Sequence, residues 1–487
     1  MKKILALIIF MTLVMGSVAF GASTRWNAMG GEHRFIIDTS NYSLYPGRIT
    51  MFGNALFVIP VAKTDVKEFY DARYFADNGF VAGALWNVKN MTMALHYNLD
   101  TAGTANLRRA LAGLAPDPEA ISNAQYDMAR KDVGSPEWLS AKAILQSQSQ
   151  KGRLNSLDVR EFPDFFWAMK SGKMSIGARV ALAMDSASDS ATPVSTPMLD
   201  EGGVVISELI KPSEEIATSA MSLDFLVGAT MYETPAGDLD LGLGIGLQSF
   251  SDDDPNSGLK IESEGGMDIA FNARLSNKMG IYTIVPVLSF GTGSNPSAVY
   301  DEKSAPNVNA VSYMKGDLGV GVRKVIKEKG LALVGILGGY NATTSAPTIT
   351  IVNTSEDGKV TKTKKEVLET TDTTLSTTLV AGCEFPVCKW LIVRGGANLK
   401  FYTFNDEIAS QEKVMNYLPG KANEITDVVV SKKSNNMDFN YNMGLRTIYN
   451  GAIIDFLLAR NVLHRGPYIL SGASGVWATH ICVTYAF

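Results

Sequence analysis

The chain has 487 residues, of which 46% are hydrophobic and 19% are charged, and its formal net charge is −5. Its 44 glycines and its many Thr, Ser, Asn and Tyr residues favour strands and turns over helices. No dense basic patch occurs, which argues against nucleic acid as a partner, and three cysteines are too few for a disulfide-rich scaffold.

The N-terminus is typical of an exported protein. Met1-Lys2-Lys3 supplies the positive start, the apolar run from Ile4 to Val14 follows, and a small-residue zone then ends at Ala22. We therefore predict a cleaved signal peptide at residues 1–21, with an uncleaved anchor as the alternative. No later stretch has the roughly 18 apolar residues that a membrane helix needs.

The dominant pattern after residue 47 is period-two alternation. In residues 238–250 the odd positions through 247 are Leu or Ile, and the even positions through 248 are Asp, Gly or Gln. Segments 221–231, 267–276 and 437–447 repeat this pattern. These segments have the length of a tilted membrane strand, and aromatic residues gather near the strand ends. The fold class is accordingly all-β, a transmembrane antiparallel up-and-down β-barrel in a bacterial outer membrane.

We expect about sixteen strands, and fourteen if one early hairpin is reassigned. They are predicted at 48–60, 79–87, 90–98, 164–171, 173–184, 218–232, 238–250, 266–277, 280–291, 311–326, 330–341, 373–386, 389–404, 436–449, 451–461 and 476–487. The connections alternate between short and long, so short turns lie in the periplasm and long loops outside. Residues 48–487 thus form the predicted barrel.

The loop at 99–163 differs in amino-acid composition from the other long loops. Asn106 to Leu114, Pro118 to Lys131 and Pro136 to Gln148 read as helices, because good helix formers are abundant and two segments start with proline. A helical extracellular loop of this kind serves either as a lid over the barrel mouth or as a protective surface layer.

The last strand carries the first family resemblance. Ile481, Val483, Tyr485 and the terminal Phe487 share one face. This pattern resembles the C-terminal signal by which the barrel-assembly machinery recognises its clients, so that machinery and outer-membrane lipid are expected partners.

Two of the three cysteines, Cys383 and Cys388, lie on opposite predicted faces, and whether they are bridged stays open.

The N-terminal region carries the second resemblance. Ala28-Met29-Gly30-Gly31, then Asp38-Thr39-Ser40-Asn41, then Tyr45-Pro46-Gly47 is similar to the start of FadL-like and PorV-like outer-membrane barrels. Tyr-Pro-Gly stands where the fatty-acid transporters have Asn-Pro-Ala, which leaves the transported solute open. The resemblance implies that residues 22–47 form a periplasmic segment or a lumenal hatch, with Glu32, Asp38 and Asn41 as hatch residues.

The alternation also directs charged side chains into the lumen. We call one set the basic tier, expected near the periplasmic turns, and the other the acidic tier, expected in the outer half of the wall. The basic tier is Arg179, Arg274, Arg323, Arg394 and Arg446, and the acidic tier is Asp224, Asp268, Asp317 and Asp438. These charges either form a charge-layered conduit for anions or serve structure, pairing with each other and pinning the hatch.

No motif for nucleotide, metal or nucleophilic chemistry is present, and the four histidines are scattered. We therefore expect no enzyme, no cofactor and no metal. The predicted function is passive uptake of small solutes, including amphipathic or hydrophobic ones, through an outer-membrane channel. The alternative is a non-transport barrel, either a surface protein or a PorV-like secretion scaffold.

Overall fold

The structure is a computed structural model that describes residues 28–29, 33–36, 39–60, 80–97, 101–112, 114, 116–190, 195–199, 205–210, 215–255, 259–300, 311–326, 330–345, 349–356, 359–415, 424–450, 452–458 and 478–486. The predicted signal peptide at residues 1–21, the hatch residues Glu32 and Asp38, and the terminal Phe487 lie outside these residues.

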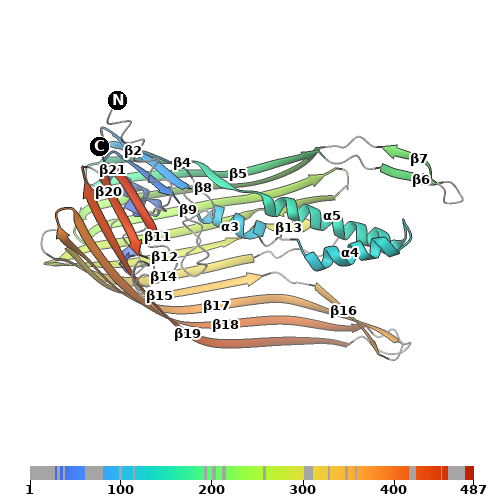
Figure 1. Cartoon of the computed structure of the whole chain (residues 1–487). Helices are drawn as coiled ribbons and strands as arrows, with labels where there is room; N and C mark the ends of the chain where they lie inside the picture. Colours follow the sequence, from blue (N-terminus) through green and yellow to red (C-terminus); the bar gives the residue numbers. More distant parts are fainter. Residues whose placement is uncertain are drawn as a thin grey trace, which may run out of the picture.

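Sixteen antiparallel strands form a closed barrel (Figure 1). They are β1 (Ala55–Pro60), β2 (Phe80–Val88), β3 (Met91–Tyr97), β4 (Arg160–Ser171), β5 (Met174–Ser190), β8 (Glu215–Thr234), β9 (Gly237–Asp254), β11 (Gly266–Met279), β12 (Tyr282–Ser294), β14 (Val311–Ile326), β15 (Gly330–Ser345), β17 (Lys359–Cys388), β18 (Leu391–Met415), β19 (Glu424–Tyr449), β20 (Ala452–Leu458) and β21 (Ala478–Ala486). Each pairs with the next, and β21 pairs with β1, with Ala55 opposite Ala486, so the ring has no free edge. The predicted count of sixteen is confirmed.

Shorter strands lie beyond the ring at the long-loop end. They are β6 (Ser195–Leu199), β7 (Val205–Ile210), β10 (Leu259–Glu264), β13 (Ser297–Tyr300) and β16 (Ile349–Glu356). The pair β6–β7 is a separate two-stranded sheet, whereas β10 pairs with β9 and β13, and β16 pairs with β17. These additions and the long strands β17, β18 and β19 carry the sheet well past the barrel itself (Figure 1).

One strand prediction was wrong at its start. Residues Pro46–Met51 form the 3₁₀ helix η3, and β1 begins only at Ala55. Two shorter turns, η1 (His33–Phe35) and η2 (Thr39–Ser43), precede it. Pro46 occupies the first turn of η3, where its missing N–H costs no hydrogen bond. Both Arg48 and its neighbour Ile49 are buried, which no strand against lipid would permit.

The two faces of the wall differ as the alternation predicts. Along β9, the even residues from Asp240 to Asp252 are buried with the single exception of Gly244, which is half-buried, whereas Leu243, Ile245 and Leu247 are over 40% exposed. In a closed barrel the exposed apolar set faces lipid, because it is on the outer side of the sheet. The buried core therefore lies in the lumen, between the wall and the segments that enter it.

The predicted loop helices are present with shifted ends. They are α3 (Ala102–Ala112), α4 (Pro118–Arg130) and α5 (Pro136–Ser156). The Asp117 carboxylate accepts hydrogen bonds from the Glu119 and Ala120 amides, and the Ser135 hydroxyl accepts one from the Trp138 amide, so both helices start where the sequence predicts. Among the described residues, none of the helices is both long and apolar enough to cross a membrane.

A charge on the lipid face tests this arrangement. Leu243 is 45% exposed near the middle of its strand, so Leu243→Arg should lower the free energy of unfolding by about 2–4 kcal/mol. Urea unfolding in lipid vesicles, followed by tryptophan fluorescence, measures this change. Leu243→Ala controls for lost volume and should cost less; equal costs would contradict a lipid-facing position.

Candidate functional site

The lumen is filled near its periplasmic end by the N-terminal segment. We call the described residues between 28 and 52 the plug. One apolar cluster joins Tyr42 and Ile49 of the plug to Leu85, Ala94, Phe166 and Ala168 of β2, β3 and β4. A second joins Met29, Phe35 and Ile36 to Val285, Val287, Leu333, Leu337 and Val380 on the opposite part of the wall. The plug therefore spans the lumen and contacts both sides.

Wall glycines provide the space in which the plug sits. A methyl group added at Gly242 would collide with the carbonyl oxygen of Leu44, and one at Gly382 with the carbonyl oxygen of Met29. Added methyl groups at Gly321 and Gly335 would lie 2.6–2.7 Å from the Phe35 ring. Because these glycines come from strands far apart in the sequence, the small lumen-facing residues form a seat shaped to this segment.

One fully buried ion-pair group consists of Asp240, Arg48 and Arg274. We call these three residues the plug latch. Arg48 of the plug donates from Nε to Asp240 Oδ1 at 2.5 Å, and Arg274 of β11 donates from Nε to Asp240 Oδ2 at 2.9 Å. Thr230 donates to the same carboxylate at 2.8 Å. All three charged side chains are fully buried, so both arginines rely on Asp240 for charge compensation, and Arg48 also lies 3.7 Å from the Asp238 carboxylate.

Arg274 also binds the plug directly. Its Nη1 donates to Asn41 Oδ1 at 2.8 Å and to the Ile36 carbonyl at 3.1 Å, and its guanidinium lies 4.8 Å from the centre of the Tyr45 ring. The hatch residue Asn41 and the basic-tier residue Arg274 thus meet inside the barrel.

A second polar chain fixes the plug to β3 and β4. The Tyr42 hydroxyl lies 2.9 Å from His96 Nε2, and His96 Nδ1 lies 3.3 Å from Asp164 Oδ2. Arg179 then donates from Nε to Asp164 Oδ1 at 2.8 Å. All four side chains are buried, so this chain also compensates its own charges.

The remaining members of the basic tier are held within the wall. Arg394 donates to Glu384 at 2.7 Å and also to Asp455, and Arg446 donates to Asp455 through two bonds of 2.8 Å. Arg323 is half-buried and lies 3.5 Å from the Ser276 hydroxyl. These hydrogen bonds all join groups of the wall, which fits the structural interpretation of the basic tier.

The acidic-tier residues have three different environments. Asp317 accepts a hydrogen bond from Arg34 of the plug at 2.9 Å and one from Ser289 at 3.1 Å. Asp438 is exposed, opposite Lys400 on β18, and joins neither the plug nor the loop helices through any described contact.

The other two acidic-tier residues hold the extracellular loop. Asp224 accepts hydrogen bonds from Thr101, just before α3, at 2.6 Å and from Ser222 at 2.9 Å. Asp268 accepts from Asn106 of α3 at 2.8 and 2.9 Å, from Gln248 at 2.8 Å, and from Tyr313. Helix α3 therefore enters the lumen from the outer side, whereas α4 and α5 project away from it (Figure 1).

A cavity of about 150 Å³ remains between these two obstructions. Ser43 and Leu44 of the plug line it on one side, and Thr101 lines it on the other. Its charged lining residues are Asp224, Asp268, Asp317, Arg179 and Lys315. The described residues contain no group of three or more His, Cys, Asp or Glu side chains arranged to hold a metal ion.

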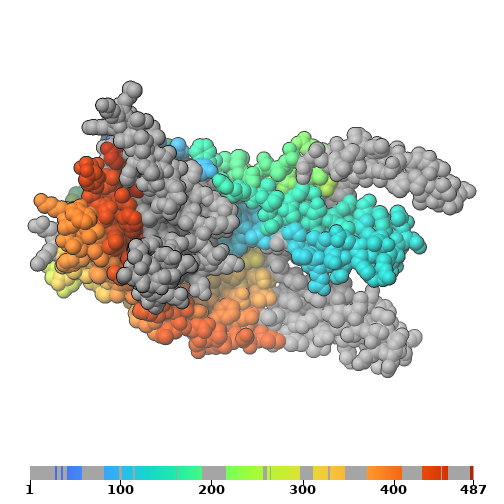
Figure 2. All heavy atoms as spheres, in the orientation of Figure 1, coloured from blue at the N-terminus to red at the C-terminus, as the bar shows by residue number. Residues whose placement is uncertain are grey.

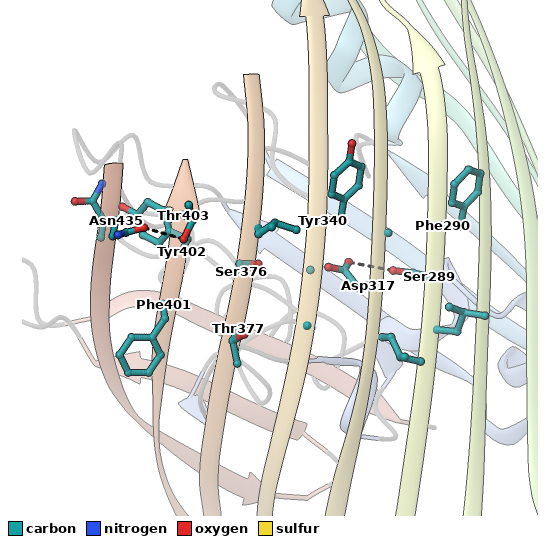
Figure 3. Close-up of a pocket in the computed structure, with 17 residues that line it drawn as sticks. Ser289, Phe290, Asp317, Tyr340, Ser376, Thr377, Phe401, Tyr402, Thr403 and Asn435 are labelled. Carbon is teal, nitrogen blue, oxygen red and sulfur yellow. Dashed lines mark hydrogen bonds between the residues drawn. The ribbon is translucent and has the colours of Figure 1, made fainter. Parts of the chain in front are cut away.

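A larger hollow of about 940 Å³ lies against β12, β14, β15, β17, β18 and β19. Figure 3 shows its labelled residues on these neighbouring strands, with the Ser289–Asp317 hydrogen bond dashed. Leu288, Leu318 and Phe401 alternate with the lumenal positions and are 43–67% exposed. The apolar part of this lining thus belongs to the lipid-facing side of the wall.

The outer end of the loop is fixed by charge. Arg153 of α5 donates from Nε and Nη2 to Asp252 at 2.9 and 2.8 Å, and from Nη2 to Asp254 at 3.2 Å. The hydrogen bond to Asp252 raises the pKa of Arg153, which keeps this guanidinium charged. Figure 2 shows α4 and α5 as a projecting mass beyond the barrel body.

Several important residues did not appear among the predicted site residues. Asp240, Asp164, Glu384 and Asp455 all pair with arginines, yet only Asp240 lay in a segment whose alternation marks it as lumenal. Plug residues Arg34 and Arg48 give no sequence signal of their own. Cys383 and Cys388, whose pairing the sequence left open, are free thiols with exposed side chains.

No protein-family model matches this chain, and no curated protein does. Similar solved structures include the ferric yersiniabactin uptake receptor FyuA from Yersinia pestis (7% identity, TM-score 0.30, 83% of this chain and 68% of that one). Two more are the ferric preacinetobactin receptor BauA from Acinetobacter baumannii (7%, 0.30, 90% and 80%) and the β-domain of the Bordetella autotransporter BrkA (13%, 0.23, 55% and 92%). At these identities and TM-scores, the likenesses carry no argument about function.

The closed barrel indicates in which membrane the protein lies. A closed sixteen-stranded antiparallel ring with an apolar outer face satisfies its backbone hydrogen bonds only within itself, as a lipid environment requires. The chain is an outer-membrane β-barrel. The FadL-like or PorV-like assignment stays a prediction.

Removing the carboxylate of the plug latch should be costly. Asp240→Ala leaves Arg48 and Arg274 buried without their shared partner, so we expect a loss of about 3–5 kcal/mol in the free energy of unfolding. The control is Glu233→Ala, which removes the exposed pair with Lys173 and should change stability little. Similar small effects for both variants would contradict a structural role for Asp240.

The glycine seat gives a separate prediction. Gly242→Val should push the plug out of its seat, so trypsin should cleave after Arg48, which is fully buried in the intact protein. Gly395→Val is the matched control, because no other atom lies within 4 Å of the added carbon. Equal protection of Arg48 in both variants would show that the plug does not depend on this contact.

Proposed function

We propose that this protein is a gated outer-membrane channel for small solutes, including amphipathic ones, in which the plug is the periplasmic gate. The observation that supports the proposal most is the plug latch. The plug is bound to the wall through buried polar groups and seated on glycines, and it lies inside the lumen where a solute would have to pass it.

Several features of the plug fit a movable part better than a permanent seal. Its described residues form short 3₁₀ turns, and its ion pairs run to wall residues. Releasing it requires breaking specific ion pairs while the backbone ladder of the barrel stays intact. The similarity of residues 28–47 to FadL-like barrels, in which this segment acts as a hatch, supports the same role.

The charge arrangement favours solutes whose passage does not require binding to the basic-tier arginines. Four of the five basic-tier residues are engaged with carboxylates: Arg179 with Asp164, Arg274 with Asp240, and Arg394 and Arg446 with Asp455. An anion would have to displace these partners at the cost of leaving a buried carboxylate uncompensated. We therefore propose that charge selectivity for anions is weak.

One observation favours the alternative of a surface or secretion-scaffold barrel. Strands β17, β18 and β19 have 30, 25 and 26 residues, whereas about 9–11 residues suffice to cross a membrane. At about 3.3 Å per residue, these strands extend far beyond the lipid. Such an extension offers a large surface for a partner and adds nothing that a simple pore needs.

Single-channel recording in planar bilayers tests the proposal. The wild-type protein should conduct rarely, because the plug closes the lumen, and Asp240→Asn should raise the open probability several-fold by removing the charge that holds Arg48 and Arg274. Glu233→Gln, at the exposed pair, should match the wild type. If neither the wild type nor Asp240→Asn conducts or admits any solute in liposome swelling, the transport proposal fails and the scaffold alternative is favoured.

A further inference from the structure

We infer that helix α3 is a second, outer gate, released independently of the plug. The inference rests on the proposed transport function and extends it: a solute would have to pass α3 first and the plug second. The geometry points to this role through three features of α3, namely a polar latch to the wall, an apolar contact one turn further along the helix, and a cavity of about 150 Å³ beneath it.

The outer latch consists of Asp224 and Asp268 with their partners on the loop. Thr101 donates to Asp224 at 2.6 Å, and the Asn106 amide donates to both oxygens of Asp268 at 2.8 and 2.9 Å. The loop residues that donate to these carboxylates, Thr101 and Asn106, both have neutral side chains. A hydrogen bond from a neutral donor to a carboxylate is weaker than the arginine–carboxylate pairs of the plug latch. Of the two segments, α3 and the plug, α3 is therefore easier to release from the wall.

Close approach of α3 to this latch depends on one residue. A methyl group at Gly103 would lie 2.6 Å from both oxygens of Asp224 and 2.7 Å from the Gln248 amide nitrogen. The first turn of the helix can therefore reach the wall only because position 103 lacks a side chain. This fit is more specific than a loop resting on a barrel mouth would require.

An apolar contact of α3, next to the polar one, provides a pivot. Leu107 and Leu111 are one helical turn apart and pack with Ala220, Phe250 and Ile261 of β8, β9 and β10. Breaking the contact between Asn106 and Asp268 would leave this apolar contact in place. The N-terminal turn of the helix can thus leave the latch while its leucines stay on the wall.

The two latches lie at different heights on the same two strands. Strand β9 carries Asp240 for the plug and Gln248 for α3, and β11 carries Arg274 for the plug and Asp268 for α3. Their spacing of six to eight residues corresponds to roughly 20–26 Å along a strand. Because no described side chain belongs to both latches, each can open while the other stays closed, and the cavity of about 150 Å³ lies between them.

Hydrogen–deuterium exchange on the full-length protein tests the independence of the two gates. Asn106→Ala removes the loop side of the Asp268 contact without altering the barrel wall. We expect amide exchange in residues 101–112 to rise by about tenfold while exchange in residues 41–52 stays at the wild-type rate. Asn123→Ala, the same change at an exposed position on α4, is the control and should alter neither segment.

Conductance of the combined variant completes the test. Asn106→Ala with Asp240→Asn should have a higher open probability than Asp240→Asn alone, because both obstructions are then loosened. Unchanged exchange in residues 101–112, or an equal rise in residues 41–52, would overturn the inference of a separate gate. A conducting Asp240→Asn variant that gains nothing from Asn106→Ala would also overturn it. If no variant conducts at all, the transport proposal fails, and exchange alone still reports whether α3 opens by itself.

Discussion

The structure depends on keeping charges inside a barrel whose outside is lipid. Asp240 illustrates the constraint: a carboxylate with no exposed surface that holds one arginine from the plug and one from the wall. Burial of three such groups is tolerable only when they are mutually bonded. The position of the plug therefore follows from the charges of the wall as much as from its own apolar residues.

The same constraint organises the rest of the lumen. Toward the periplasm, carboxylates meet arginines, as in the Asp164–Arg179 and Asp455–Arg446 pairs. Toward the outside, Asp224 and Asp268 meet hydroxyl and amide donors from the loop and the wall. The plug is therefore held by charge pairs and α3 by neutral hydrogen bonds, whereas α5 of the same loop is held further out by the pairs of Arg153 with Asp252 and Asp254. This gradient in the strength of polar contacts is the physical basis for treating the two obstructions as different gates.

Glycine has a complementary role, because it decides where backbone can approach backbone. The plug meets the wall at Gly242 and Gly382, and α3 meets it through its own Gly103. In each case a larger residue would hold the two segments apart. The small residues on the lumenal side of the alternation thus mark contact positions for the inserted segments, whereas in an open pore they would only widen the channel.

The sequence alone determined the barrel, its sixteen strands, the lipid-facing set and the three loop helices, because period-two alternation and helix starts are local properties of the chain. It did not determine the pairing of Arg48 with Asp240, which are 192 residues apart. It also misplaced the start of β1, since Arg48 and Ile49 are both buried once the lumen encloses them on all sides. Which lumenal charges pair, and which glycines face the plug, follows from strand register and barrel closure, so only the tertiary structure could decide it.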